Sequence, residues 1–267
     1  MTLPEILILA FSMIATFAFA TWIVSLLLKD VSIVDSVWPL LILTGTLTYI
    51  FRSTTIGPRA FVVLGLVALW GLRLSAHIIW RHWGEPEDRR YQAIRARNEP
   101  YFSWKSLVIV FALQAVLAWI VSLTTLAAII NLRTWQWIDT VAVCIIFAGV
   151  LFEAVADWQL ARFKSNPVHK GLVMDQGLWR FSRHPNYFGE FCVWWGIYLL
   201  ALSTQTWWAI ASPVLMSFLL LKVSGVTLQE ETIAQRRLGY KDYIARTNAF
   251  FPGPQKQLID QVKKPAK

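Results

Sequence analysis

The sequence contains little charge for its length. Only 15% of its 267 residues are Asp, Glu, Lys or Arg, whereas a soluble domain has about 25%. Hydrophobic residues make up 56% of the chain, and residues 6–28 contain no charge over more than the roughly 20 residues that a bilayer-spanning helix needs. Glu5 replaces the positive start of a signal peptide. We therefore expect an integral membrane protein whose first apolar block is a retained span.

Cysteine and the familiar nucleotide-binding motifs are also scarce. The two cysteines, Cys144 and Cys192, both lie in apolar blocks, which predicts neither a disulfide framework nor a zinc site. The sequence has no Gly-rich dinucleotide fingerprint, phosphate-binding P-loop, His/Glu metal box or Ser-His-Asp arrangement. A Rossmann domain is therefore excluded as a source of nucleotide binding. The net charge of +9 would suggest nucleic acid in a soluble protein, but here we expect membrane lipids and no nucleic acid.

The apolar residues form long blocks without the strict alternation of barrel strands. Length and pattern both favour helices. We expect an all-α, polytopic membrane bundle of about seven helices, forming a single domain over residues 1–252, with a polar basic tail at 253–267. Six spans remain if one of the last two blocks is re-entrant. The blocks cover roughly residues 5–28, 34–51, 58–80, 105–130, 137–156, 186–204 and 206–223.

The basic residues predict the orientation of the bundle. They gather in residues 81–105, in residues 157–185 and from residue 222 onward, while the opposite loops hold only Arg52, Arg59 and Arg133. Seven spans place all the basic stretches on one side, and the positive-inside rule makes that side cytoplasmic. We expect the N-terminus outside, the C-terminus in the cytoplasm, and a monomer in a bacterial inner membrane rather than the endoplasmic reticulum. Most of these charges set orientation alone.

Several charged residues lie inside the apolar blocks, where each is costly unless it faces a protected cavity. Arg73, His77 and Arg81 are four apart and share one helix face. Asp35 lies just inside the second block before Trp38, and an apolar setting can suppress its ionisation. We expect Asp35, Arg73 and His77 to form a catalytic group. The alternatives are arginines that extend toward the inner surface and a simple helix-start acid.

The inner end of the fifth block carries two acids. Glu153 and Asp157 are four apart, and Lys164 lies on the same stripe if the helix continues. Buried acids need partners, and basic residues follow nearby. The interpretations are a polar pocket that binds a charged cofactor, or a structural ion-pair network. The neighbouring basic residues are Arg162, Lys164, Arg180 and Arg183.

The run Ser-Arg-His-Pro-Asn-Tyr-Phe-Gly-Glu occupies residues 182–190. Its proline interrupts the chain before the sixth block, and Asn186 is a suitable N-cap. A helix N-terminus preceded by Arg183 and His184 suits an anion such as phosphate. Glu190 shares a face with Asn186, so the two can hold ribose hydroxyls or a carboxamide. The alternative is a capped helix start with a rim of charges.

A further polar segment follows the seventh block. It is interpreted as a contribution to the cofactor site or as an amphipathic helix on the lipid headgroups. Its acidic, basic and aromatic residues are Glu230, Glu231, Arg236, Arg237, Tyr240 and Tyr243.

At Asp157 and the run 182–190 the chain resembles the steroid 5α-reductase superfamily, and in particular its DUF1295 branch, over roughly residues 30–252. The resemblance implies seven membrane helices, NADPH bound from the cytoplasmic side, and reduction of the C=C bond of an α,β-unsaturated ketone in a steroid or other lipid. It places the cofactor-binding Asp, Asn and Glu of the family on Asp157, Asn186 and Glu190. A family Arg becomes Lys164, which keeps the charge but loses the bidentate fork.

The catalytic half of the resemblance is less complete. The acid of the second span falls near Asp35, and the Tyr of the third span is replaced by Trp70, which has no hydroxyl. The implied reaction is hydride transfer to the β-carbon of an enone, with an acid that stabilises the enolate oxygen. No metal is expected. The expected cofactor-binding residues are Asp157, Arg162, Lys164, Arg180, Arg183, His184, Asn186, Tyr187, Glu190, Glu231, Arg236, Tyr240 and Tyr243.

Two other classes of function fit parts of the pattern. The Arg-His-Pro-x-Tyr pattern also occurs in membrane methyltransferases of the isoprenylcysteine or phospholipid type, which would bind S-adenosylmethionine, and Glu230 and Glu231 fit their glutamates. A non-catalytic lipid-binding or scaffold protein is the third class. The spacing of Asp157 before Asn186 favours the reductase, and the many arginines suit the additional phosphate of NADPH.

Overall fold

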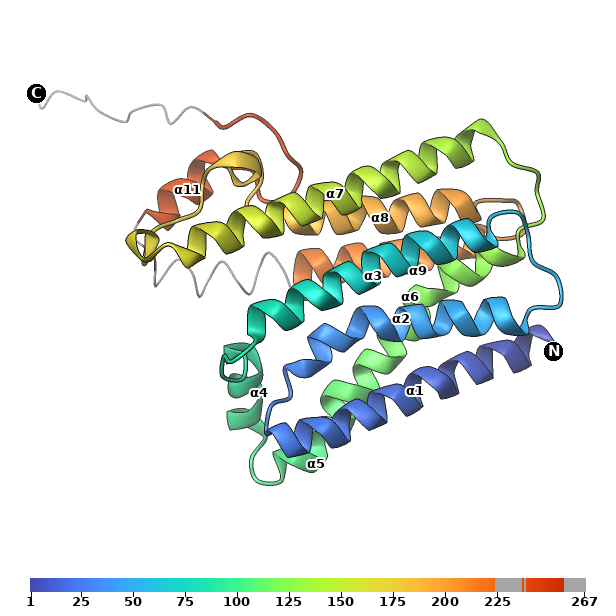
Figure 1. Ribbon diagram of the computed structural model, residues 1–267, viewed down its shortest axis with the longest axis horizontal. Helices are drawn as coiled ribbons and strands as arrows, with labels where there is room; N and C mark the ends of the chain where they lie inside the picture. Colours follow the sequence, from blue (N-terminus) through green and yellow to red (C-terminus); the bar gives the residue numbers. More distant parts are fainter. Residues whose placement is uncertain (224–236, 238, 257–267) are drawn as a thin grey trace, which may run out of the picture. The chain divides into compact units, whose positions relative to one another are not determined.

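The computed structural model describes residues 1–223, 237 and 239–256, and these residues form helices and turns without a strand. Five helices are long and apolar enough to cross a membrane (Figure 1). The all-α membrane fold is therefore confirmed. The five helices are α1 (Leu3–Leu28), α2 (Ile33–Arg52), α3 (Ala60–His82), the helix Phe102–Ile130 and α7 (Trp137–Ser165). Phe102–Ile130 comprises α5 (Phe102–Ser106), a π-helical segment (Leu107–Ala112) and α6 (Leu113–Ile130).

The last two apolar blocks form shorter helices. Block 186–204 becomes α8 (Pro185–Ala201, 17 residues), and block 206–223 becomes the apolar helix Trp207–Lys222, which includes α9 (Ala211–Phe218). A helix of 17 residues is about 26 Å long, somewhat less than the roughly 30 Å of a hydrocarbon core. The count of seven spans and the orientation of the termini therefore stay predictions.

The chain divides into two compact units. The first comprises residues 1–146 and 194–215, and the second comprises residues 147–193 and the residues from 216 onward. The helices α7 and α8 each run continuously from one unit into the other. The expectation of a single membrane domain over residues 1–252 stays a prediction.

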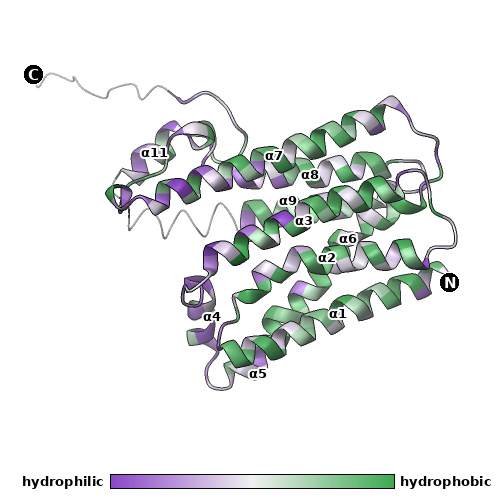
Figure 2. Cartoon of the chain, viewed as in Figure 1, coloured by the Kyte–Doolittle hydropathy of each residue, from purple (hydrophilic) through white to green (hydrophobic). Residues whose placement is uncertain are grey.

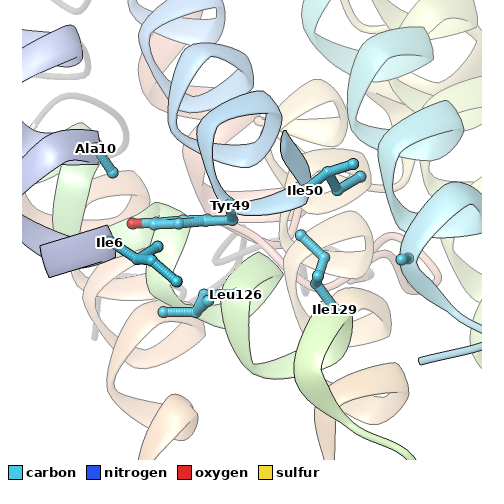
Figure 3. Packing of buried hydrophobic residues seen from close by; sticks show 7 residues of the cluster. Ile6, Ala10, Tyr49, Ile50, Leu126 and Ile129 are labelled. Carbon is cyan, nitrogen blue, oxygen red and sulfur yellow. The ribbon is translucent and has the colours of Figure 1, made fainter. Parts of the chain in front are cut away.

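The first unit has a core in which α1, α2 and α6 pack together. Figure 3 shows Tyr49 of α2 reaching toward Ile6 and Ala10 of α1, with Leu126 and Ile129 of α6 beside it. The Tyr49 hydroxyl lies 3.0 Å from the Ser122 hydroxyl. Hydroxyl contacts often help helices to associate in a membrane. An apolar side chain is surrounded by apolar groups in lipid as well as in protein, so its burial alone favours association little.

The basic stretch 81–105 is more ordered than the expected loop, because it folds into α4 (Arg89–Asn98) and α5. Figure 2 shows α4 as one of the most hydrophilic helices. Its anchor is apolar, since Tyr91 packs in a buried cluster with Trp22 and Phe102. Glu87 adds an ion pair of 2.8 Å to Arg95. Charge counting alone does not predict this helix, because contacts with residues distant in sequence hold it to the unit.

Arg59 and Arg133, expected as loop charges on the opposite side, belong to a buried ion-pair network. The Arg59 guanidinium is fully buried and donates to both Asp139 oxygens, at 2.8 and 2.7 Å. Arg133 adds a contact of 2.8 Å to the same carboxylate. A buried charge needs paired geometry of this kind. The network therefore joins the start of α3 to the start of α7.

Candidate functional site

In the second unit α7 and α8 approach each other backbone to backbone at two glycines. A Cβ added at Gly189 would lie 2.6 Å from the Gly149 carbonyl oxygen and 2.7 Å from the Glu153 backbone nitrogen. No side chain fits at such distances, so glycine is required for this crossing. The close approach brings together the polar residues that lie within about two turns of these glycines on the two helices.

Four polar residues form what we call the α7–α8 polar group: Glu153 and Asp157 on α7, and Asn186 and Glu190 on α8. The Asn186 amide nitrogen donates to Asp157 Oδ1 at 3.2 Å. The three carboxylates are only 2, 6 and 7% exposed for Glu153, Asp157 and Glu190. Buried carboxylates require hydrogen-bond donors or a cation beside them, so a ligand that contacts this group would present hydroxyls, amides or a positive charge to it.

The helix α8 begins one residue earlier than expected, at Pro185, so Asn186 is not its N-cap. Proline fits the first helical position because its φ is already helical and it lacks an N–H. The cap position is His184, whose backbone N–H donates to the Ser182 hydroxyl at 3.1 Å. Its ring stacks on Tyr187 with centroids 5.5 Å apart. The Asn186 side chain is thereby directed to α7 instead of to its own helix end.

Arg183 and Tyr243 hold α11 (Tyr240–Arg246) against the segment before α8. The Arg183 guanidinium donates to the Thr247 carbonyl at 2.5 Å and to the Ile244 carbonyl at 3.1 Å. Tyr243 donates its hydroxyl to the Trp179 carbonyl at 2.5 Å. A cation at the carbonyl end of a helix is stabilising. Both side chains thus have a structural role that the sequence pattern did not predict, and a cofactor role for them stays a prediction.

The cations that follow Asp157 lie near or beyond the end of α7. This helix continues to Ser165, so residues 157–164 are helical. Arg162 is exposed, and its guanidinium lies 5.5 Å from the centre of the Trp158 ring. Lys164 is exposed at the helix end, and Arg180 is exposed at the end of the 3-10 helix Gly177–Arg180. All three are accessible to an anionic ligand.

The predicted residues after the seventh block divide into two sets. Tyr240 is buried at the start of α11, with its ring 5.7 Å from that of Tyr243. Glu231 and Arg236 lie outside the described residues, as does Glu230, so their roles stay predictions.

In the first unit Asp35 binds two residues of α4. Its Oδ2 accepts from Arg90 at 2.7 Å and its Oδ1 accepts from the Tyr91 hydroxyl at 2.7 Å. Asp35 is therefore the acceptor of an ion pair with Arg90 and of the Tyr91 hydroxyl, and its catalytic role stays a prediction. Burial raises the pKa of Tyr91 well above its ordinary value, and the Asp35 carboxylate raises it further.

The polar residues Arg73 and His77 and the tryptophan Trp70, all on α3, have different environments. Arg73 and His77 are partly buried, four apart on α3, as expected. Trp70 is fully buried, and its ring meets that of Trp194 edge-on at 5.2 Å. Trp70 is therefore a core residue. Sequence analysis did not single out Tyr91, because this residue lies outside the apolar blocks.

Comparison with known proteins agrees with the resemblance. The chain is 24% identical over 267 residues to an uncharacterized protein of Schizosaccharomyces pombe, an alignment that covers 86% of this chain and 75% of that protein. No solved structure matches the chain. The family described as "Protein of unknown function (DUF1295)" matches residues 21–247. The chain therefore belongs to the DUF1295 family, which is part of the steroid 5α-reductase-like group of membrane proteins.

Proposed function

We propose that this protein is an NADPH-dependent membrane reductase that transfers hydride to the C=C bond of an α,β-unsaturated ketone in a steroid or another lipid. The observation that carries the proposal is the pairing of Asn186 with Asp157, with Glu190 one turn further along α8. These are the three residues on which the resemblance to the reductases places cofactor binding.

The α7–α8 polar group offers mainly acceptors to a ligand. Asp157 and Glu190 can accept hydrogen bonds from ribose hydroxyls or from the carboxamide of a nicotinamide ring. Because the Asn186 amide already donates to Asp157, its orientation is fixed and its oxygen is the end that can accept. The exposed cations Arg162, Lys164 and Arg180 are suited to the phosphates. NADPH, when bound, supplies the hydride, and these residues hold and orient it.

Reduction of an enone places negative charge on the substrate oxygen, which a hydrogen-bond donor stabilises. We propose the Tyr91 hydroxyl as that donor, with its single proton turning from the Asp35 carboxylate to the substrate oxygen. Asp35 accepts from Tyr91 and would act as its positioning residue, while Arg90 balances the charge of Asp35. Arg73 and His77 on α3 remain further candidates for the electrophilic role.

The buried carboxylates favour a second candidate, an S-adenosylmethionine-dependent methyltransferase. Three acids below 8% exposure would attract the sulfonium and ammonium groups of that cofactor. We rank this function second, because the reductase residues Asp157, Asn186 and Glu190 all match, and because the exposed basic residues nearby suit phosphates.

Thermal unfolding of the detergent-purified protein separates the two functions. A ligand at one hundred times its Kd stabilises a protein by about 2.7 kcal/mol, which is measurable as a rise in Tm. We expect NADPH to raise the Tm, NADH to raise it less, and S-adenosylmethionine to leave it unchanged. Stabilisation by S-adenosylmethionine alone would contradict the reductase, and no effect of any of the three would contradict a nucleotide site.

We also propose a monomer in a bacterial inner membrane, with the N-terminus outside and the C-terminus in the cytoplasm. The clustering of basic residues supports this orientation. A green fluorescent protein fused to the C-terminus should fluoresce, because it folds only in the cytoplasm, whereas alkaline phosphatase at the same place should be inactive. The reverse pair of results would contradict the proposed topology.

A further inference from the structure

A basic cavity of about 350 Å³ lies at the end of α7, within the second unit. Three cationic side chains line it, Lys164, Lys170 and Arg237, together with His169. None of the nine described residues that line it is a carboxylate. The carbonyl end of a helix carries about half a negative charge. The three positive side chains outweigh it, so the net charge around the cavity is positive. The cavity therefore favours an anion.

The basic groups are held in place by contacts that do not involve a ligand. The His169 ring stacks on Phe163 with centroids 4.3 Å apart, and its Nδ1 donates to the Phe163 carbonyl at 3.1 Å. Arg237 donates to the Leu172 carbonyl. The turn between His169 and Leu172 contains Gly171, whose φ of +84° favours glycine. Such preorganisation lowers the entropic cost of binding.

One neutral donor, the side chain of Asn166, completes the lining. Asn166 Oδ1 accepts from the Val168 backbone at 3.0 Å, so its amide nitrogen is the end that can donate to a ligand. Cationic and amide donors around one cavity match the oxygens of a phosphate group.

The surroundings of the cavity indicate the source of that phosphate. The cavity lies at the end of α7, a helix apolar enough to cross a membrane. Two large apolar side chains are exposed beside the cations, Val168 at 79% and Leu172 at 48%. Basic and apolar groups side by side are typical of a surface that contacts lipid headgroups. We propose that this cavity binds the phosphate headgroup of an anionic lipid.

Photo-crosslinking tests this site directly. The full-length protein is reconstituted in phosphatidylcholine nanodiscs with a diazirine-bearing phosphatidic acid, irradiated and digested. We expect labelling of residues 163–172 that unlabelled phosphatidic acid removes and additional phosphatidylcholine does not. Equal competition by phosphatidylcholine would overturn the proposal. Competition by glycerol 3-phosphate at the same concentration would overturn the lipid source and assign the cavity to a soluble phosphate ester.

Matched variants connect the labelling to the cavity. Lys170→Gln with Arg237→Gln should reduce the labelling about twenty-fivefold, at about fivefold for each basic side chain. Lys170→Arg with Arg237→Lys keeps both charges and should retain the labelling. Arg97→Gln with Lys105→Gln removes two exposed charges from the first unit and should leave labelling of 163–172 unchanged. Undiminished labelling in the first pair, or its loss in the third, would contradict the site. The readout requires no NADPH, and the variants leave Lys164, which the reductase proposal assigns to the NADPH phosphates, unchanged.

Discussion

Asn186 donates its side-chain amide to the Asp157 carboxylate at 3.2 Å, across 29 residues of sequence. The contact joins α8 to α7 within the second unit. It depends on the approach of the two helices at Gly149 and Gly189, where a Cβ on either glycine would meet the carbonyl oxygen of the other. The polar residues proposed to bind the cofactor are thus positioned by two residues that have no side chain.

Gly189→Ala should destabilise the second unit and weaken cofactor binding with it. The added methyl would lie 2.7 Å from Glu153 Cβ, and overpacking of this kind costs about 1–3 kcal/mol. Thermal unfolding in detergent measures the effect. Gly65→Ala on α3 is the matched control, because a Cβ there meets nothing within 4 Å, and alanine should be neutral or stabilise by up to about 1 kcal/mol. Equal Tm values for the two variants would contradict the close helix crossing.

Removing one member of the Arg59–Asp139 ion pair should be strongly destabilising. Both side chains are fully buried, so Asp139→Asn leaves the Arg59 charge without its bidentate partner, at a cost of about 3–5 kcal/mol. Arg95→Gln breaks the more exposed pair with Glu87 and should cost under about 1 kcal/mol. Chemical denaturation of both variants measures the difference. Similar losses would show that burial does not determine the strength of these pairs.

Tyr91→Phe should lower turnover while NADPH still binds. The change removes the hydroxyl that donates to Asp35 at 2.7 Å and keeps the ring that packs with Trp22 and Phe102. Loss of a donor to the developing oxyanion is expected to reduce kcat by roughly a hundredfold or more. Steady-state kinetics with an enone lipid measures it, and Tyr101→Phe, which alters an exposed ring, serves as control. A normal kcat would exclude Tyr91 from the reaction.

Lowering the pH should destabilise the contacts that hold α4, because Glu87 becomes protonated. Burial raises the pKa of Glu87, but hydrogen bonds from Arg95 and the Val31 backbone outweigh it, so the pKa lies below the ordinary value of 4.5. The stabilisation is therefore complete above about pH 4.5 and is lost as the pH falls through the lower folded value. We expect wild type and Glu87→Gln to differ in Tm at pH 7 and to converge as the pH falls from 4.5 to 3. A constant difference would contradict this linkage.

Much of the fold was predictable because membrane helices depend on local composition. The first five apolar blocks became the five long helices. The helix α7 continues beyond the predicted end of its block to Ser165, which is the condition under which Lys164 was placed on the stripe of Asp157. The helix α4 was not predicted, because its residues are mostly polar and it is held by Tyr91 in a cluster of rings distant in sequence. Arg59 was assigned to a loop, because its partner Asp139 is 80 residues away.

The sequence indicates the candidate site residues that lie together in one motif. It does not indicate contacts between residues that are far apart in the chain. Asn186 and Glu190 stand in one dense run, and the pairing of Asn186 with Asp157 agrees with the expected grouping. The contact of Asp35 with Tyr91 joins the second span to a basic stretch that charge counting assigned to orientation. The structural role of Arg183 at the end of α11 likewise depends on a tertiary contact.

The most direct test of the central claim is the equilibrium affinity of the purified protein for NADPH, measured by nicotinamide fluorescence. Asn186→Ala and Glu190→Ala should each weaken binding at least about tenfold, which corresponds to about 1.4 kcal/mol. Asn166→Ala removes an exposed amide outside the α7–α8 polar group and should bind NADPH like wild type. Unchanged affinity in both Asn186→Ala and Glu190→Ala would contradict the assignment of this group as the cofactor site.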